Sequence, residues 1–346
     1  MKMLLVCSLF IFSLQARVLT VMSYNAHNLF DTTHDIGKKD YTYLPLSFKQ
    51  QSQEVQDYCN SLSSEYYKKN CLTFDWSERV LNQKLDNIKK VLITLSNGRG
   101  ADVIALQEVE NINVLKMLQR KLARYGYRYI SLLEGPDSRG IDVGFISKYR
   151  INKEVLHHVK MDGVAKETRG ILEIEIEVNN KKVVLFSNHW PSQNNPDEAR
   201  LIAAQTLVKA AKNASRNADL VIALGDFNTL EDDAPNGIRE AARYFDLSRD
   251  EASLRDVKLF KGTHWYAGHW SALDKILVFE KYSKDITPLY RKYDIFHYNF
   301  LLGRLVWTDR DTGNQTTYNN VPIAFDWKTG RGYSDHLPVL MQFEIK

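Results

Sequence analysis

The chain has 346 residues, of which 44% are hydrophobic and 25% charged, and its formal net charge is +4. This composition excludes a disordered or fibrous protein and is typical of a globular protein with an ample core. The small basic excess suits an anionic partner but does not establish one, because 42 acidic residues are also present.

The first residues are typical of a secretory signal peptide. One lysine precedes an apolar run from Leu4 to Leu14, and Ala16 offers a small residue for cleavage. The run is too short for a permanent membrane anchor, and its alternative is a buried first strand. We therefore expect a secreted or periplasmic protein, with a signal peptide at residues 1–16 and one folded domain at residues 17–346.

Removal of the signal would leave only two cysteines, Cys59 and Cys71, which close a short loop. In an exported protein such a pair is more often bridged than free, so the sequence predicts a Cys59–Cys71 disulfide. Both cysteines lie in a polar insertion, residues 31–76, between the first strand and the first convincing helix. A connection of this length is usually functional or partly ordered in its own right.

Hydrophobic periodicity predicts the remaining elements. Helical spacing of apolar residues predicts helices at residues 77–95, 112–125 and 197–213. Short aliphatic runs predict strands at residues 18–21, 102–109, 127–133, 143–147, 151–158, 171–178, 182–188 and 220–224. Asn179-Asn180 is a hairpin signal between two of these strands. Apolar strands of this kind need cover on both faces, so we predict an α/β fold with four layers, α/β/β/α, built on two packed mixed sheets.

Polar side chains adjoin seven of the apolar runs. They are Asn25 with Asn28, Gln107-Glu108, Asp142, Asn188-His189, Asp226 with Asn228, Asp274, and Asp335-His336. Side chains at the same kind of strand end are expected to meet at one rim of the fold. Carboxylates, carboxamides and two histidines are what metal-assisted attack on a phosphate ester requires.

The motifs around these positions resemble those of the endonuclease/exonuclease/phosphatase superfamily, which has the DNase I-like fold. In chain order they are Tyr24-Asn25-Ala26-His27-Asn28-Leu29-Phe30, Leu106-Gln107-Glu108-Val109, Gly140-Ile141-Asp142-Val143, Asn188-His189-Trp190-Pro191-Ser192, Gly225-Asp226-Phe227-Asn228 and Ser334-Asp335-His336-Leu337-Pro338. One motif alone would be weak, but six in the superfamily's order, each beside a strand, are specific. The resemblance covers nearly the whole mature chain and is nearest to the secreted bacterial nuclease branch.

The resemblance implies a divalent cation. Glu108 would be its principal ligand, and Asn25 and Asp335 would complete or flank the site. Mg²⁺ suits such oxygen ligands, with Mn²⁺ as a substitute and Ca²⁺ as a further candidate. The alternative for Glu108 is a solvated charge after a strand.

The resemblance also implies roles for two histidines. His189 and His336 would transfer protons and neutralise the transition state, because imidazole titrates near neutrality. Asp142 would orient His189, and Asp274 would orient His336. The alternative is that both histidines are ordinary polar residues.

Asp226 would position or deprotonate the attacking water, and Asn228 would contact the scissile phosphate. The alternative for this pair is an Asx-type turn that closes the strand. Further candidates for substrate contacts are Asn28, Arg139 and Arg200. Surface salt bridges are the alternative for the two arginines.

The function that we expect is hydrolysis of nucleic acid, with DNA rather than RNA as substrate, by a monomeric, secreted, Mg²⁺-dependent and non-specific endonuclease. Residues 263–266 and Trp270 could stack on bases or pack in the core. A sphingomyelinase-type phosphodiesterase is the enzymatic alternative. It would need an exposed apolar hairpin, and residues 301–307 come nearest, although Gly303-Arg304 interrupts them. An inactive binding protein is the other alternative, but none of the acid and base positions is missing.

Overall fold

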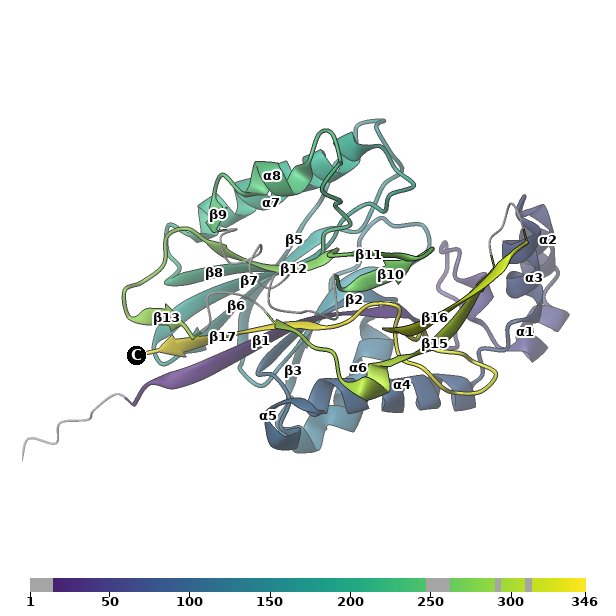
Figure 1. Cartoon of the computed structure of the whole chain (residues 1–346), viewed down its shortest axis with the longest axis horizontal. Coiled ribbons are helices and arrows are strands. Elements are labelled where there is room, and N and C mark those ends of the chain that lie inside the picture. Colours follow the sequence, from purple (N-terminus) through teal and green to yellow (C-terminus); the bar gives the residue numbers. More distant parts are fainter. Residues whose placement is uncertain (1–14, 247–261, 290–293, 309–312) are drawn as a thin grey trace, which may run out of the picture.

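The computed structural model describes residues 15–246, 262–289, 294–308 and 313–346. The predicted signal peptide therefore lies almost entirely outside the described residues. Two large mixed sheets pack against each other with helices on their outer faces, which confirms the predicted four layers (Figure 1). Within the described ranges, no helix has the length and apolar character needed to cross a membrane.

The first sheet contains the two chain segments nearest the termini. Its strands are β1 (Arg17–Leu29), β2 (Val103–Val109), β3 (Tyr129–Ser131), β4 (Asp142–Ser147), β13 (Ile286–Pro288), β14 (Asp294–Ile295) and β17 (Val339–Ile345). They follow the order β13-β17-β1-β2-β4-β3, and β14 also pairs with β17. β1 runs parallel to β2 and antiparallel to β17, so residues before β17 lie near the end of β1.

The second sheet follows the order β5-β6-β7-β8-β12-β9. Its strands are β5 (Ile151–His157), β6 (Ile171–Val178), β7 (Lys181–His189), β8 (Leu220–Asp226), β9 (Phe245–Asp246) and β12 (Asp274–Phe279). The hairpin predicted at Asn179-Asn180 joins β6 to β7. Its two residues have φ values of 53° and 61°, which asparagine tolerates and a two-residue hairpin turn requires.

Helices cover the outer face of each sheet. They are α4 (Glu78–Ile93), α5 (Leu95–Gly98), α6 (Ile112–Leu122), α7 (Asp197–Ala214) and α8 (Gly237–Ala241). Alternation along β8 separates the layers, because Ile222 and Leu224 join the core between the sheets whereas Val221 and Ala223 pack under α7. The predicted helix 112–125 is shorter, since a 3-10 turn, η2 (Ala123–Tyr125), leads to Gly126 at φ 94°.

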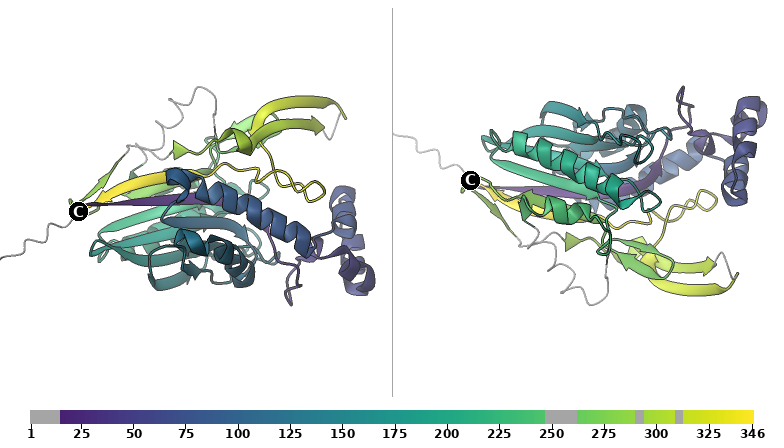
Figure 2. Two further views of the ribbon diagram at one scale, coloured as in Figure 1. Left: turned by 90° about the horizontal axis from the view of Figure 1, so that it is seen from below. Right: turned by 90° about the horizontal axis from the view of Figure 1, so that it is seen from above.

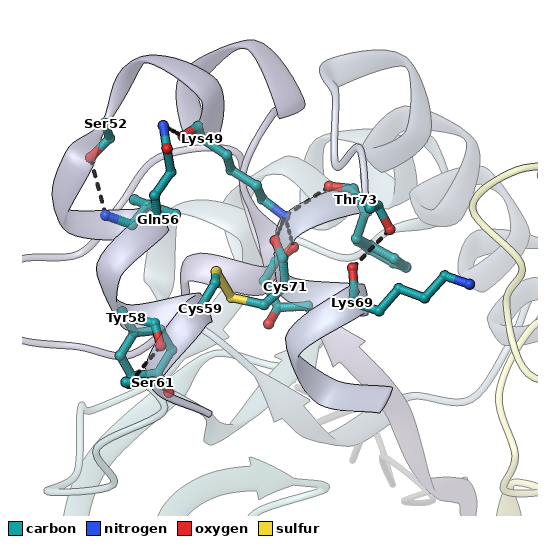
Figure 3. The surroundings of a disulfide bond; sticks show 12 residues. Lys49, Ser52, Gln56, Tyr58, Cys59, Ser61, Lys69, Cys71 and Thr73 are labelled. Atoms are coloured by element: carbon teal, nitrogen blue, oxygen red, sulfur yellow. Dashed lines mark hydrogen bonds between the residues drawn. A yellow bond between two sulfur atoms is a disulfide. The ribbon is translucent and has the colours of Figure 1, made fainter. Parts of the chain in front are cut away.

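The polar insertion folds into helices that the sequence did not predict. They are η1 (Tyr41–Tyr43), α1 (Leu46–Gln51), α2 (Gln53–Ser61) and α3 (Glu65–Thr73). Ser52 caps α2 and Ser64 caps α3, each hydroxyl accepting from a backbone N–H of the first turn. The predicted disulfide between Cys59 and Cys71 is confirmed and joins these two helices, with 5.5 Å between the Cα atoms (Figure 3).

Lys49 is buried in the same insertion, beside the disulfide (Figure 3). Its Nζ donates to three backbone carbonyl oxygens, those of Thr42 at 2.6 Å, Cys71 at 2.9 Å and Phe74 at 2.8 Å. All three donors of the ammonium group therefore have acceptors. The insertion also has its own small core, which contains Cys59 and Cys71.

Two small hairpins lie outside the large sheets. One consists of β10 (His264–Tyr266) and β11 (His269–Ser271), and the other of β15 (Leu302–Thr308) and β16 (Gln315–Pro322). The 3-10 turn η3 (Asn299–Leu301) directly precedes β15. The β15–β16 hairpin extends away from the sheets (Figure 2). The Gly303-Arg304 interruption does not prevent it, because a shift in register between Gly303 and Leu305 accommodates the break.

Candidate active site

The register of the second sheet places three of the predicted residues in one row. His189 at the end of β7 lies opposite Asp226 at the end of β8, and Asp274 at the start of β12 lies opposite Asp226 on its other side. A Cβ atom at Gly225, where φ is +147°, would lie 2.0 Å from the carbonyl oxygen of Asn188. Glycine is therefore required for β7 and β8 to approach each other here.

Irregular backbone at the ends of β1 and β2 orients the residues of the first sheet. The pairing of β2 with β4 shifts register around Glu108, which has a φ of 57°. Bulges of this kind commonly redirect side chains beside active sites. The carboxylate of Glu108 accepts from the backbone N–H of Asn28 at 2.8 Å and from Nδ2 of Asn25 at 3.4 Å.

The site residues of the first sheet meet those of the second sheet where the two sheets face each other. Nδ2 of Asn25 also donates to Oδ2 of Asp226 at 3.1 Å. Nε2 of His189 lies 3.7 Å from that oxygen and 3.9 Å from Oε1 of Glu108. Nε2 of His336 lies 3.9 Å from Oδ2 of Asp226. Asn25, His189 and His336, from segments far apart in the sequence, thus gather around the carboxylate of Asp226. Glu108 joins them through Asn25 and His189.

His336 has the predicted partner. Its Nδ1 lies 2.7 Å from Oδ2 of Asp274, which also accepts from the hydroxyl of Thr263 at 2.7 Å. Burial alone would lower the pKa of His336, but Asp274, Asp226 and Asp335 together raise it well above its ordinary value. The imidazole therefore carries a proton at neutral pH, and its Nε2 faces Asp226.

His189 does not have the partner predicted for it. Asp142 instead accepts from the backbone N–H of Gly135 at 2.9 Å, and no group within the described ranges bonds to Nδ1 of His189. Arg169 contacts the same residue, since its Nε donates to the carbonyl oxygen of His189 at 2.9 Å. Burial, together with the charges of Arg169 and Arg139, lowers the pKa of His189 well below its ordinary value, so the ring is neutral.

Asn228 forms the turn that was the alternative reading of this pair. Its backbone N–H donates to Oδ1 of Asp226 at 2.9 Å, and its φ is 46°. The side-chain Nδ2 donates to the carbonyl oxygen of Trp190 at 3.1 Å. The amide of Asn228 is thus already engaged within the protein, while the turn fixes the direction of the Asp226 carboxylate.

The two candidate arginines have different surroundings. Arg200 is fully buried and pairs with Asp233 at 2.7 Å and with Asp197, so the prediction that it contacts substrate is wrong. Arg139 has a side chain that is 54% exposed, and it lies 3.9 Å from Asp137. It remains a candidate for contact with an anion.

The donor set fits a divalent cation. Ligand atoms of Asp226, Asp274 and His336 lie within 4.8 Å of one another, and those of His264, Asp335 and His336 form a second such group. In both groups the carboxylates would be the ligands while His336 keeps its proton. Among the described residues, Oδ1 of Asp274 is buried without a hydrogen-bond partner. Carboxylate oxygens of this kind are the ligands that hard cations prefer.

Asn25 and Asp335, which were predicted to complete or flank the cation site, have different surroundings. Asn25 directs its Nδ2 toward Glu108 and Asp226, and its Oδ1 accepts from the backbone N–H of His27 at 2.9 Å. In this orientation Asn25 holds the two carboxylates in place. Burial would raise the pKa of Asp335, but nearby histidines, His27 foremost, hold it well below its ordinary value, so the group is ionised.

Several residues at the site received no role from the sequence. They are His27, Lys84 and Arg169. Lys84 is buried on α4, its Nζ donates to the carbonyl oxygen of His27, and the ring of Trp76 lies 5.6 Å away. A lysine on the apolar face of the predicted helix was a usable signal for Lys84. Nothing in the local pattern distinguished Arg169, whose contacts are all distant in sequence.

Comparison with known proteins agrees with this geometry. A sequence profile described as the Endonuclease/Exonuclease/phosphatase family matches residues 53–345. The chain belongs to the endonuclease/exonuclease/phosphatase family. Members of this family are phosphodiesterases and phosphatases that generally depend on a divalent metal. A search of curated proteins finds no match.

Solved structures show the same fold at low sequence identity. An endonuclease/exonuclease/phosphatase family protein from Bacteroides thetaiotaomicron superposes with a TM-score of 0.53 and 14% identity, covering 96% of this chain and 99% of the other. TDP2 from C. elegans gives 0.52 and 15%, covering 95% and 75%. Beta toxin from Staphylococcus aureus gives 0.50 and 15%, covering 93% and 99%.

Proposed function

We propose that this protein is a secreted, Mg²⁺-dependent phosphodiesterase that hydrolyses nucleic acid, acting on DNA as a non-specific endonuclease. The observation that carries the proposal is the approach of His189 and His336 to Asp226, at 3.7 Å and 3.9 Å, with Glu108 3.9 Å from His189 on the other side. Acids and imidazoles at this spacing can surround one phosphate group. If these residues lay in separate regions of the fold, the proposal would have no structural basis.

In this proposal Glu108 is the principal ligand of the cation, and Asp335 and Asn25 flank it. A bound Mg²⁺ would supply Lewis acidity and offset the charge of the phosphate. Burial, with Asp274 and Glu108 close by, raises the pKa of Asp226 to about 7 even though His336 opposes this effect. A cation near these carboxylates would favour their ionised forms.

The chain's own groups would move the protons. Asp226 positions the attacking water and can accept its proton at Oδ2, which both Nε2 atoms face. His336 holds a proton at Nε2 because Nδ1 is bonded to Asp274, and it can donate to the leaving oxygen. His189 is neutral and buried, and orients the water or a phosphate oxygen. Arg139 and Asn28 remain candidates for contacts with the substrate backbone.

The disulfide supports the proposed secretion. Disulfides persist in oxidising compartments and are uncommon in the cytosol, so Cys59–Cys71 agrees with the signal peptide predicted at residues 1–16. A secreted or periplasmic location would bring the enzyme into contact with extracellular nucleic acid.

The β15–β16 hairpin bears on the choice between nucleic acid and lipid. A sphingomyelinase would need an apolar projection for membrane contact. Val306, at 49% exposure, is the large apolar residue that the described part of this hairpin exposes. The other exposed side chains on it are polar or charged: Arg304, Thr308, Gln315, Thr316, Thr317, Asn319 and Asn320. This surface suits a hydrated anionic polymer better than a bilayer interior.

Substrate assays with and without EDTA test the proposal. Purified protein should cleave plasmid DNA when Mg²⁺ is present and stop when EDTA removes it, and the rate at low substrate should fall as salt rises. Parallel reactions with RNA and with sphingomyelin vesicles define the substrate. Hydrolysis of sphingomyelin without cleavage of nucleic acid would overturn the substrate assignment. Binding of DNA without hydrolysis under any metal would favour the inactive binding protein.

A further inference from the structure

The β10–β11 hairpin carries an exposed aromatic side chain close to His336. Tyr266, at the end of β10, has 52% of its surface exposed, whereas the preceding Trp265 is buried at 6%. Ala267 and Gly268 follow, with φ values of 48° and 90°, and form the turn of the hairpin. Tyr266 therefore stands at the tip of a short, tightly turned element.

This element is attached directly to the catalytic segment. His264 and His336 form a β-bridge, and the N–H of Leu337 donates to the carbonyl oxygen of Thr263 at 2.7 Å. The rings of His264 and His336 have centroids 4.6 Å apart. The ring of Tyr266 is nearly parallel to that of His264, at 11° and 6.5 Å between centroids. Tyr266 thus lies one ring beyond His264 in a series that begins at His336.

The β15–β16 hairpin holds Tyr266 from the other side. Trp307 packs at a steep angle to Tyr266, with 5.0 Å between centroids and 77° between planes. Trp307 also contacts Trp265 at 6.0 Å, and Trp265 contacts Tyr318 at 4.7 Å. An aromatic cluster from both hairpins therefore fixes the position of an exposed ring, which lowers the entropic cost of ligand binding.

Neither core packing nor membrane contact accounts for the position of Tyr266. A ring that is half exposed contributes less to the core than the buried Trp265 does. Contact with a membrane would call for apolar neighbours, but Thr308 on β15 and Thr317 on β16 are exposed and polar. The surroundings instead combine aromatic rings with hydrogen-bonding groups.

We infer that Tyr266, braced by Trp307, stacks on a nucleobase next to the scissile phosphate, and that the preferred substrate is therefore nucleic acid with unpaired bases. Stacking on aromatic side chains is sequence-tolerant because every base has a flat face, whereas in a duplex those faces are covered by neighbouring base pairs. Single-stranded nucleic acid should consequently bind better than the same sequence as a duplex. This inference rests on the proposed function and assigns its specificity to a residue outside the group that reacts.

Binding and cleavage should be measured separately. Fluorescence anisotropy with a phosphorothioate oligonucleotide and Mg²⁺ reports binding without turnover, with the strand presented alone or annealed to its complement. Wild type is compared with Tyr266→Ala, with Tyr266→Phe and with Tyr129→Ala. Tyr129 is 36% exposed and pairs with Ser147. Ser147 is at the other end of β4 from Asp142, so Tyr129 is a matched tyrosine away from the site. Thermal unfolding checks that each variant is folded.

The expected result is a selective loss in one variant. Tyr266→Ala should weaken single-strand binding by about five-fold or more and raise KM rather than lower kcat, because a base–aromatic contact is removed. Tyr266→Phe should retain binding, and Tyr129→Ala should match wild type. Equal affinity for single strand and duplex in wild type, or an unchanged affinity in Tyr266→Ala, would overturn the inference. Tyr266-dependent binding without cleavage would keep it and would refute the proposed hydrolysis instead.

Discussion

The disulfide-closed insertion and the rim around Asp226 both bury charged side chains, but they treat them differently. In the insertion, the ammonium group of Lys49 donates to three carbonyl oxygens beside the disulfide. At the rim, Nδ1 of His189 and Oδ1 of Asp274 are buried with no partner in the part of the chain that the structure describes. Buried polar groups with satisfied hydrogen bonds are expected where a region only has to be stable. Unsatisfied buried polar groups cost free energy and are expected where a ligand or cation must bind.

The backbone shows the same contrast. Four of the nine non-glycine residues with positive φ in the described ranges, His27, Asn28, Glu108 and Asn228, lie at the rim, and none lies in the insertion. In the insertion, α2 and α3 begin with ordinary serine caps. Strained backbone persists where surrounding structure enforces it, and it is concentrated at sites of function. The comparison predicts that changes at the rim should alter rate, whereas changes in the insertion should alter stability.

The largest expected effect is on catalysis. Replacing His189 or His336 by alanine should slow turnover of DNA by about two orders of magnitude or more, because each change removes a proton-transfer or charge-stabilising group. Steady-state kinetics measure the effect. His157→Ala is the matched control, since its Nε2 lies 2.7 Å from Glu173, much as His336 pairs with Asp274. Near-normal rates in both rim variants would exclude these histidines from the mechanism.

The disulfide should have the next largest effect, on stability alone. Replacing Cys59 and Cys71 by serine opens a loop with a sequence separation of 12. The free energy of unfolding of the insertion should fall by about 3 kcal/mol, the chain-entropy value for a loop of this length. Denaturant titration in oxidising and reducing buffer measures it, and wild type in reducing buffer should resemble the variant. A loss of kcat in the folded variant would contradict the separation of the two regions.

The smallest expected effect is a pH dependence from Lys49. Burial lowers its pKa from 10.5 to about 7, so between these values the unfolded state binds the proton more tightly than the folded state. Stability should therefore rise with pH across this window, and between pH 7 and pH 8, where it is measured, the rise should be about 1 kcal/mol. The difference in unfolding free energy between wild type and Lys49→Met isolates this contribution. A flat difference would mean that the three carbonyl bonds keep the ammonium group charged.

Much of this organisation could be predicted from local sequence. Apolar runs gave the central strands, and polar residues at their ends gave the rim, because sheet register brings such ends together. The Asp274–His336 pair also followed from the family resemblance. The functions of individual polar residues were less predictable, since partners are chosen by tertiary contacts. Arg200 is committed to Asp233, which lies 33 residues away, and Asp142 turns toward Gly135.

The insertion was predicted poorly for a different reason. Its helices are short and mostly polar, so hydrophobic periodicity is weak there, and a disulfide and a small core stabilise them. Ser52 and Ser64 were usable signals for helix starts. The β15–β16 hairpin was likewise obscured, because an irregular register absorbs the Gly303-Arg304 break.

Gly225 gives the fold a simple indicator of competence. It reacts with nothing, yet a single methyl group there would collide with the Asn188 carbonyl and push apart the strands that end in His189 and Asp226. A homologue of this chain could keep every acidic residue and every histidine of the site and still be inactive if it lost this glycine. The presence of glycine at position 225 would thus distinguish active homologues from inactive ones better than the presence of the reactive side chains.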